Sequence, residues 1–181
     1  MPDEMVVRHC APTLASIKTG SLFVCPYVSR TALYASIRSL NQRLGGKGLR
    51  VIPLRCRDGR CMVYVYRPER LARDLSDEAA AKLLRSCGYS ECSVSACVRH
   101  LRMRLKDSGE FPHEIGLFLG YPPEDVAGFI AHGEPKCTGC WKVYGDADAA
   151  QRTFARYRKC TDAYLRLHAQ GRGIEWLTVA I

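Results

Sequence analysis

The sequence predicts an α+β fold in which a small antiparallel sheet from the N-terminal half packs with a mainly helical C-terminal half. Two runs of alternating apolar residues, 49–56 and 61–66, flank the turn Arg-Asp-Gly-Arg at 57–60. Asp-Gly between two such runs is a strong β-hairpin signal. A third apolar run, SLFVC, occupies 21–25 and indicates another strand. From residue 68 onwards, apolar residues recur mostly at helical spacing.

The N-terminal half reads as β-α-β-β, preceded by short helices. Residues 3–9 predict a short helix, and Pro12-Thr13 predicts the start of a separate helical turn through Lys18. A longer helix over 31–44 should end at Gly45-Gly46. The length of 181 residues suits a single domain over 1–181, β-rich over 1–67 and helical over 68–181.

The hairpin turn fixes a register in which residue 56 pairs with 61, 54 with 63 and 52 with 65. The core face would then consist of Ile52, Leu54, Cys56, Cys61, Val63 and Val65. Pro53 lacks a donor for the sheet ladder, which predicts that strand 49–56 lies at an edge. Cys56 and Cys61 should face each other, reduced in the cell and able to form a crosslink under oxidation.

The C-terminal half is predicted to contain one short strand among several helices. The strand is expected at 141–144, because Trp-Lys-Val-Tyr reads as extended. The helices are expected at 68–75, 76–86, 93–107, 113–119, 123–131, 146–170 and 174–179.

Charge and composition restrict the function classes without choosing one. The formal net charge is +9, which permits binding to polyanions or to a small anionic ligand in a cleft. The first ten residues carry two acids and no apolar run, and no stretch is apolar enough to span a membrane. A cytoplasmic protein without membrane contact is expected, and its ten cysteines are then more often free, metal-bound or reactive than disulfide-bonded.

The segment HEIGLFLGYPPEDVAGFI at 113–130 has the outline of a helix-turn-helix. A recognition helix presents basic and amide side chains to the major groove. The second helix here begins with Glu124 and Asp125, and residues 114–130 contain no Arg, Lys, Asn or Gln. A packing corner is therefore favoured over sequence-specific DNA recognition, and duplex binding should be weak and salt-sensitive.

Two segments suggest a thiol-dependent site. If a helix begins at Thr13, Cys10 lies just before its N-terminus, where the helix dipole lowers a thiol pKa, with His9 adjacent and Lys18 further on. Pro112 predicts a second helix start, with His113 and Glu114 in its first turn. We hypothesise that Cys10 and His113 meet in one pocket as nucleophile and neutral base. The alternatives are a buried structural cysteine and a plain capping pair.

The segment HGEPKCTGCWKVYGD at 132–146 allows two further interpretations. Cys137 and Cys140 have the spacing of a metal knuckle, which His132 and Cys160 would complete for zinc or iron. His113 is an alternative fourth ligand. Trp141, Lys142 and Tyr144 together could hold an anionic, partly planar ligand. The alternative for these three residues is a strand edge with a buried tryptophan.

Four blocks resemble the bacterial family known as domain of unknown function 3793. They are HCAPTLASIKTGSLF at 9–23, FPHEIGLFLGYPPEDVAGFI at 111–130, CWKVYGD at 140–146 and YRKCTDAY at 157–164. They follow in the same order and span nearly the whole chain. The resemblance implies no activity, but it directs attention to the candidate residues that the blocks contain, among them His9, Cys10, His113, Trp141 and Cys160.

Three classes of function remain from the sequence. The first is a thiol-dependent enzyme or small-ligand-binding protein with a site made from Cys, His, Glu and Lys. The second is a metal-binding protein that uses the Cys137–Cys140 segment. The third is a basic module that binds nucleic acid or a protein partner.

Overall fold

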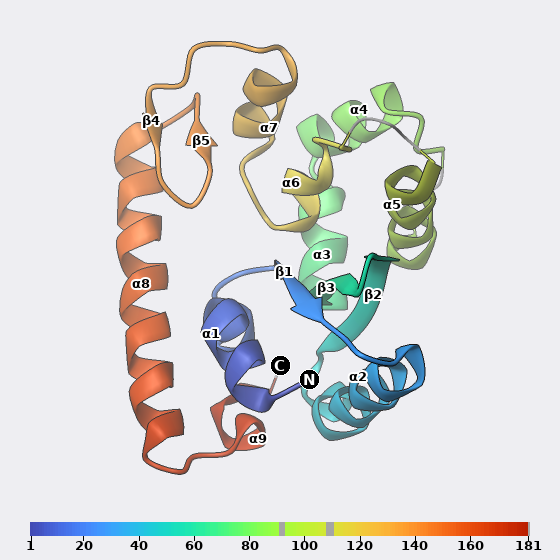
Figure 1. Ribbon diagram of the computed structural model, residues 1–181. Coiled ribbons are helices and arrows are strands. Elements are labelled where there is room, and N and C mark those ends of the chain that lie inside the picture. The colour runs from blue at the N-terminus through green and yellow to red at the C-terminus, as the bar shows by residue number, and fades with distance from the viewer. Residues whose placement is uncertain (91–92, 108–110, 181) are drawn as a thin grey trace. The chain divides into compact units, whose positions relative to one another are not determined.

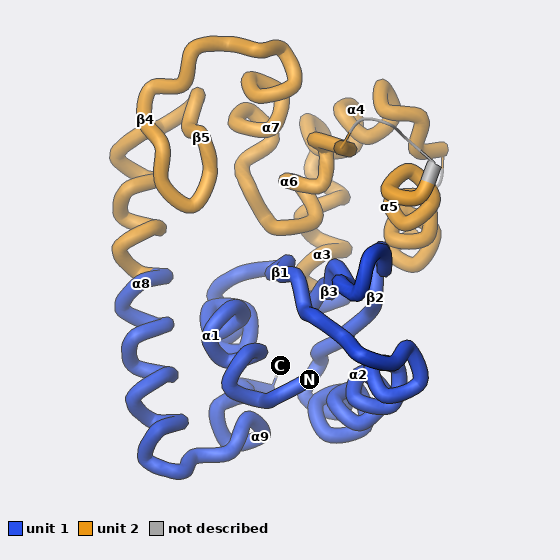
Figure 2. Tube along the Cα trace, viewed as in Figure 1, with its two compact units in different colours: residues 1–69, 157–181 blue, residues 70–156 orange. Residues whose placement is uncertain are grey.

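The computed structural model describes residues 1–90, 93–107 and 111–180, and confirms the α+β class. The chain divides into two compact units (Figure 2): unit 1 comprises 1–69 and 157–181, and unit 2 comprises 70–156. One boundary falls near the start of helix α3 (Pro68–Leu75), and the other falls inside the long helix α8 (Ala147–Ala169). Within the described residues, no helix is long and apolar enough to cross a membrane.

Unit 1 contains a three-stranded antiparallel sheet in the order β1-β3-β2 (Figure 1). The strands are β1 (Gly20–Pro26), β2 (Arg50–Arg57) and β3 (Arg60–Tyr66). Its helices are α1 (Asp3–Leu14), α2 (Arg30–Leu44), the 3-10 turn η1 (Gly45–Lys47), the C-terminal part of α8, and α9 (Ile174–Leu177). The Ser29 side chain caps α2 by accepting a hydrogen bond from the Ala32 N–H.

The predicted register of the β2–β3 hairpin is confirmed next to the turn but is wrong further along the strands. Cys56 pairs with Cys61 as predicted, but a bulge between Pro53 and Arg55 places Pro53 opposite Val63 and Ile52 opposite Tyr64. The proline cannot donate to the ladder, and a bulge on an edge strand accommodates it. Strand β2 does lie at an edge, as predicted. Because of the shift, Val51 is buried in place of the expected Ile52.

Cys56 and Cys61 face each other across this hairpin and are joined by a disulfide, with Cα atoms 4.0 Å apart. The hairpin turn predicted that the Cys56 and Cys61 side chains lie opposite each other on one face of the sheet, and the structure confirms this pairing. The sequence predicted that the two thiols are reduced in the cell and form a disulfide under oxidation. The structure shows the oxidised, disulfide-bonded form.

The expected break before Pro12 is wrong, because α1 runs without interruption from Asp3 to Leu14. Pro12 has no N–H to donate to the carbonyl four residues before it, yet α1 continues for two residues beyond it. The Pro12 carbonyl accepts the Ile17 and Lys18 N–H groups at 2.9 and 3.1 Å, which closes the helix. Cys10 therefore lies inside a helix and not in front of one.

A fully buried arginine joins distant segments of unit 1. The Arg67 Nε donates to the Thr13 carbonyl at 2.7 Å, and Nη2 donates to Leu14 at 2.7 Å and to Val179 at 2.8 Å. Its Nη1 reaches the Lys47 carbonyl at 3.1 Å. The guanidinium thus connects the end of α1, the turn η1 and the segment after α9, around a core formed mainly by Val, Leu and Ile side chains.

Unit 2 is mainly helical, as predicted. It contains most of α3, α4 (Glu78–Ser86), α5 (Val94–Asp107), α6 (Ile115–Phe118), α7 (Pro123–Ile130) and the start of α8. The expected strand at 141–144 is shorter, β5 (Lys142–Val143), and it pairs with β4 (Cys137–Thr138), which the sequence did not reveal. This small ribbon carries the residues that shape the site described next.

Candidate functional site

A pocket of about 310 Å³ in unit 2 brings together several of the predicted site residues. We call it the aromatic pocket. Its walls come from the segment before α6, from the Tyr121 corner, from α7 and from β5. The lining residues that define it are Phe111, His113, Tyr121, Phe129, Trp141 and Lys142, with Ile115, Gly116, Asp125 and Val126 behind them.

The corner between α6 and α7 brings Tyr121 to the pocket. Gly120 adopts a positive φ of 76°, and the Tyr121 N–H returns to the Gly116 carbonyl at 3.0 Å, which ends α6 tightly. Gly116 allows close packing, because a Cβ there would meet Val126 at 2.8 Å and the Tyr121 ring at 3.1 Å. The corner is therefore a packing device that also forms one wall, as the sequence favoured.

Asp125 fixes the position of Trp141, which lies next to Tyr121 in the pocket wall. It lies at the start of α7 with a 3% exposed side chain, and one carboxylate oxygen accepts the Trp141 Nε1–H at 2.6 Å. The other oxygen accepts the N–H groups of Tyr144 and Gly145, both at 2.7 Å. Three donors from 141–145 thus satisfy a buried carboxylate and hold the Trp141 indole against α7.

Aromatic contacts set the shape of the walls. The Tyr121 and Trp141 rings stack with centroids 4.7 Å apart and an interplanar angle of 25°. Trp141 also meets Phe154 edge-on at 4.5 Å, so the indole is supported from outside the pocket. The rings of His113 and Phe129, which also line the pocket, meet edge-on with centroids 4.9 Å apart. Such pairs orient rings as well as burying them.

Lys142 supplies positive charge at the pocket. Its side chain is exposed, and the ammonium lies 5.4 Å from the centroid of the Phe129 ring. His113 is exposed at the rim. Among the described residues that line the pocket, the remaining side chains are aromatic or aliphatic apart from the Asp125 carboxylate, whose oxygens already accept three hydrogen bonds. The arrangement suits a flat apolar ligand that carries an anionic group.

Glu114 faces away from this pocket, into the interior of unit 2. It is 2% exposed, accepts the Tyr89 hydroxyl at 3.0 Å and pairs with the Arg104 Nε at 2.9 Å. Burial, followed by the charge of Glu114, raises the pKa of the Tyr89 hydroxyl. Glu114 therefore links α5 to the start of α6, and His113 next to it is the member of the pair that reaches the pocket.

The predicted residues near the N-terminus belong to unit 1. Cys10 is fully buried inside α1, and this burial raises the pKa of its thiol to about 12 despite the nearby Lys18. His9 is exposed and stacks on Phe23 with centroids 5.2 Å apart. Lys18 is partly buried, with its ammonium 5.8 Å from the Tyr157 ring. The local basis for a reactive thiolate, a helix start after Cys10, is absent, while the pairing of Cys10 with His113 stays a prediction.

The structure gives the metal hypothesis no support within the residues it describes, where no three His, Cys, Asp or Glu side chains gather to hold an ion. Cys137 is partly buried in β4 against Val143 and Phe154, while Cys140 and His132 are exposed. Cys160 lies on the part of α8 that belongs to unit 1, and burial raises its thiol pKa to about 11.

Tyr144, the third expected ligand-binding residue of the 141–144 segment, is used for packing. Its ring lies so close to Gly128 that any side chain at that position would collide with it. Gly133 also approaches the same ring at contact distance. Tyr144 thus packs the ribbon against α7, while Trp141 and Lys142 line the aromatic pocket.

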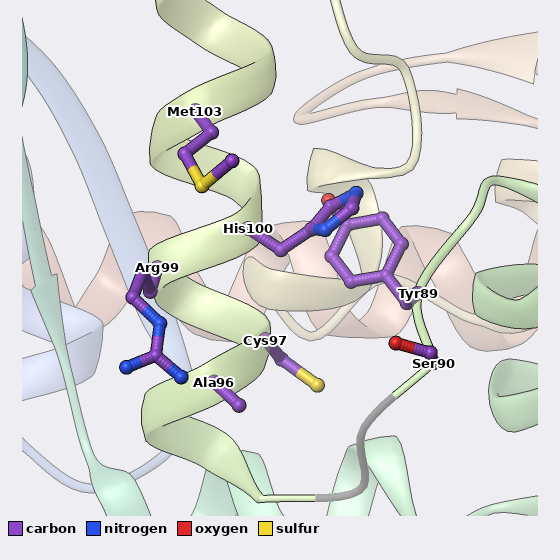
Figure 3. Close-up of a pocket in the computed structure, with 7 residues that line it drawn as sticks. All are labelled: Tyr89, Ser90, Ala96, Cys97, Arg99, His100 and Met103. Atoms are coloured by element: carbon purple, nitrogen blue, oxygen red, sulfur yellow. The ribbon is translucent and has the colours of Figure 1, made fainter.

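A second, smaller pocket of about 180 Å³ lies between α5 and the segment after α4. Figure 3 shows Cys97, His100 and Met103 on α5, with Tyr89 and Ser90 across from them. The His100 and Tyr89 rings, which both line this pocket, lie 4.3 Å apart. Its thiol, Cys97, is only 3% exposed, so we assign the candidate site to the aromatic pocket.

A family model described as "Protein of unknown function (DUF3793)" matches residues 6–178, and the chain belongs to this family. No curated protein and no solved structure matches it. The match covers the whole of unit 2, including every residue that lines the aromatic pocket, and unit 1 except for residues 1–5 and 179–181.

Proposed function

We propose that this family member binds a small molecule in the aromatic pocket of unit 2, and that the ligand has a flat apolar body and an anionic group. The observation that carries the proposal is the convergence of four aromatic rings and one ammonium on a single pocket of about 310 Å³. That volume lies at the lower end of known ligand pockets and suits a ligand of one or two fused rings.

The walls favour a planar ligand. Trp141 is held by Asp125 and Phe154, so its position is set before any ligand arrives. Phe129 and His113, which also line the pocket, meet edge-on. Binding to preformed walls avoids the entropy cost of ordering side chains. Each aromatic contact with a ligand ring then contributes on the order of 1 kcal/mol beyond simple burial.

The charges favour an anion over a cation. Lys142 presents an exposed ammonium at the pocket, and His113 can add a hydrogen-bond donor at the rim. The negative group, Asp125, already accepts three hydrogen bonds from residues 141–145. The proposal is one of binding. Thiol catalysis by Cys10 is no part of it, because burial raises the pKa of that thiol to about 12.

A direct test uses 8-anilinonaphthalene-1-sulfonate, a flat aromatic sulfonate that brightens in apolar sites. The chain has two tryptophans, and in a Trp176→Phe background Trp141 is the sole tryptophan reporter. Saturable one-to-one binding should quench Trp141, because the probe would lie against its ring. Lys142→Gln should weaken binding roughly fivefold through loss of one partly solvated ion pair. Phe129→Ala should weaken it about tenfold through loss of a wall.

Two controls distinguish binding in the aromatic pocket from nonspecific binding of the probe elsewhere on the protein. Lys82→Gln removes the same charge from an exposed position on α4 and should leave affinity unchanged. N-phenyl-1-naphthylamine, which has the rings without the sulfonate, should respond to Phe129→Ala but not to Lys142→Gln. Unsaturable binding, or equal effects of the two lysine variants, would contradict the proposal. Tighter binding of a quaternary ammonium probe would reverse the assigned charge.

A further inference from the structure

The positive charge of the chain is concentrated in unit 1. Unit 1 holds 15 Arg and Lys residues against 6 Asp and Glu, whereas unit 2 holds 12 of each. The whole formal charge of +9 therefore belongs to unit 1, and unit 2, with the aromatic pocket, is formally neutral. Such segregation produces a local field that a chain-wide average conceals.

Part of this charge forms a stripe on α2. Arg30, Tyr34 and Arg38 follow at four-residue spacing, and all three are exposed, so they lie along one outer face of the helix. Arg30 also hydrogen-bonds through its side chain to Tyr27, which raises the pKa of its guanidinium. Tyr34 is 42% exposed between two guanidinium groups.

The tip of the β2–β3 hairpin extends the same basic region. Arg57 and Arg60 are direct cross-strand partners, and both are exposed. The Tyr27 N–H donates to the Gly59 carbonyl at 2.8 Å, which ties the turn to the segment that leads into α2. Asp58 pairs with Arg57 at 3.2 Å, but both side chains are more than two-thirds exposed, so this pair offsets little. We call Arg30, Tyr34, Arg38, Arg57 and Arg60 the arginine face.

Two placements in this face work against local stability. Arg30 is in the first turn of α2, where the helix dipole disfavours a cation and where no acidic residue compensates. Arg57 and Arg60 oppose each other directly, where like charges repel. Residues that conflict with local preferences, without a gain in packing, point to a functional role.

We infer that the arginine face binds single-stranded nucleic acid through its phosphates and through stacking of a base on Tyr34. All of its cations are arginines, whose planar forks bind phosphates by two hydrogen bonds and also stack on bases. An exposed tyrosine among arginines gives a sequence-tolerant platform for an unpaired base. In a duplex the base faces are stacked inside the helix, so Tyr34 would contribute nothing there. This inference concerns unit 1 and is independent of the ligand proposed for unit 2.

The test measures anisotropy of a labelled oligouridine of about 20 nucleotides with the full chain over a range of salt concentrations. Arg57→Gln with Arg60→Gln should weaken binding about tenfold and reduce the salt slope by about 1.4, since each phosphate contact on a single strand contributes roughly 0.7. Tyr34→Ala should weaken binding at least fivefold, which corresponds to about 1 kcal/mol of stacking, without changing the salt slope.

A matched control removes two exposed arginines from unit 2. Arg85→Gln with Arg102→Gln lowers the total charge equally and should change affinity by less than about twofold. Equal loss in both double variants would overturn the inference, because only net charge would then matter. So would insensitivity to Tyr34→Ala, equal affinity for duplex, or tighter binding to phosphatidylserine vesicles than to the oligonucleotide. Circular dichroism verifies that each variant is folded.

Discussion

Replacing Arg67 by Met is expected to destabilise unit 1 strongly, although sequence patterns assign no role to this arginine. The side chain is fully buried, and its guanidinium donates to four backbone carbonyls that belong to three separated segments. Methionine fills a similar length with an apolar chain, so the change mainly removes donors and charge and leaves little empty volume.

The size of the stability loss depends on whether each carbonyl retains another hydrogen-bond donor when Arg67 is replaced. The Thr13 carbonyl still accepts the Ser16 N–H at 3.2 Å, and the Leu14 carbonyl still accepts the Val179 N–H at 3.0 Å. The loss therefore falls most heavily on the carbonyls of Lys47 and Val179. A buried acceptor left unpaired costs about 1–3 kcal/mol, and the two weakened ones cost less, so we expect a loss of about 3–5 kcal/mol. Arg67→Lys keeps the charge without the planar fork and should lose roughly half as much.

Urea denaturation followed by circular dichroism, and by Trp176 fluorescence in a Trp141→Phe background, measures the effect. Trp176 lies in α9, close to the segment that Arg67 holds, and therefore reports on unit 1. Arg158→Met, at an exposed position on α8, is the matched control and should change the free energy of unfolding by less than about 0.5 kcal/mol. The reasoning is refuted if the free energy of unfolding of Arg67→Met lies within about 1 kcal/mol of that control, which is the contribution of one ordinary hydrogen bond.

Two further predictions concern buried groups of each unit. Burial raises the pKa of Cys10 to about 12 from an ordinary value near 9, so the folded state holds this proton more tightly than the unfolded state does. The resulting stability is present below pH 9 and is lost as pH rises toward 12. By pH 10 the loss is about 1.4 kcal/mol in the free energy of unfolding. Urea titrations at pH 8 and pH 10 should therefore differ by about this amount more for the parent chain than for Cys10→Ala. In unit 2, Asp125→Asn places an amide nitrogen where a carboxylate oxygen accepted a donor, and should cost about 2–3 kcal/mol. Trp141 emission in the Trp176→Phe background should shift to the red, and an unchanged spectrum with unchanged stability would contradict the anchoring role of Asp125.

The elements that sequence analysis predicted well are those with a strong local signal. The hairpin follows from Asp-Gly between alternating runs, and α2, α5 and α8 follow from long helical periodicity. The failures have equally local causes. Pro12 was taken as a helix boundary because proline cannot donate the i→i−4 hydrogen bond, but α1 continues through it to Leu14. Pro53 did signal an edge strand, but the bulge that moves the register beyond it left no separate signal.

The site was predictable only in part. Trp141, Lys142 and His113 were found because they are unusual residues in compact blocks, and they do line one pocket. Phe129 and Tyr121 were not singled out, because they belong to the 113–130 segment that the sequence assigned to a packing corner. An aromatic residue in such a segment gives no signal that one of its ring faces lines a pocket. The concentration of charge in unit 1 was equally hidden, because the boundaries between units depend on contacts between distant residues.

Three buried charged residues form contacts that the sequence patterns did not predict. Arg67, Glu114 and Asp125 are each at most 3% exposed, whereas pattern analysis places such residues at the surface or at helix ends. Each satisfies partners that are remote in sequence: backbone carbonyls for Arg67, the Tyr89 hydroxyl and Arg104 for Glu114, and donors from 141–145 for Asp125. A buried charge persists only where such partners converge, so it marks a point that the fold must hold precisely. Of the three, Asp125 alone lines the candidate pocket, and its hydrogen bonds hold Trp141 in place before a ligand binds.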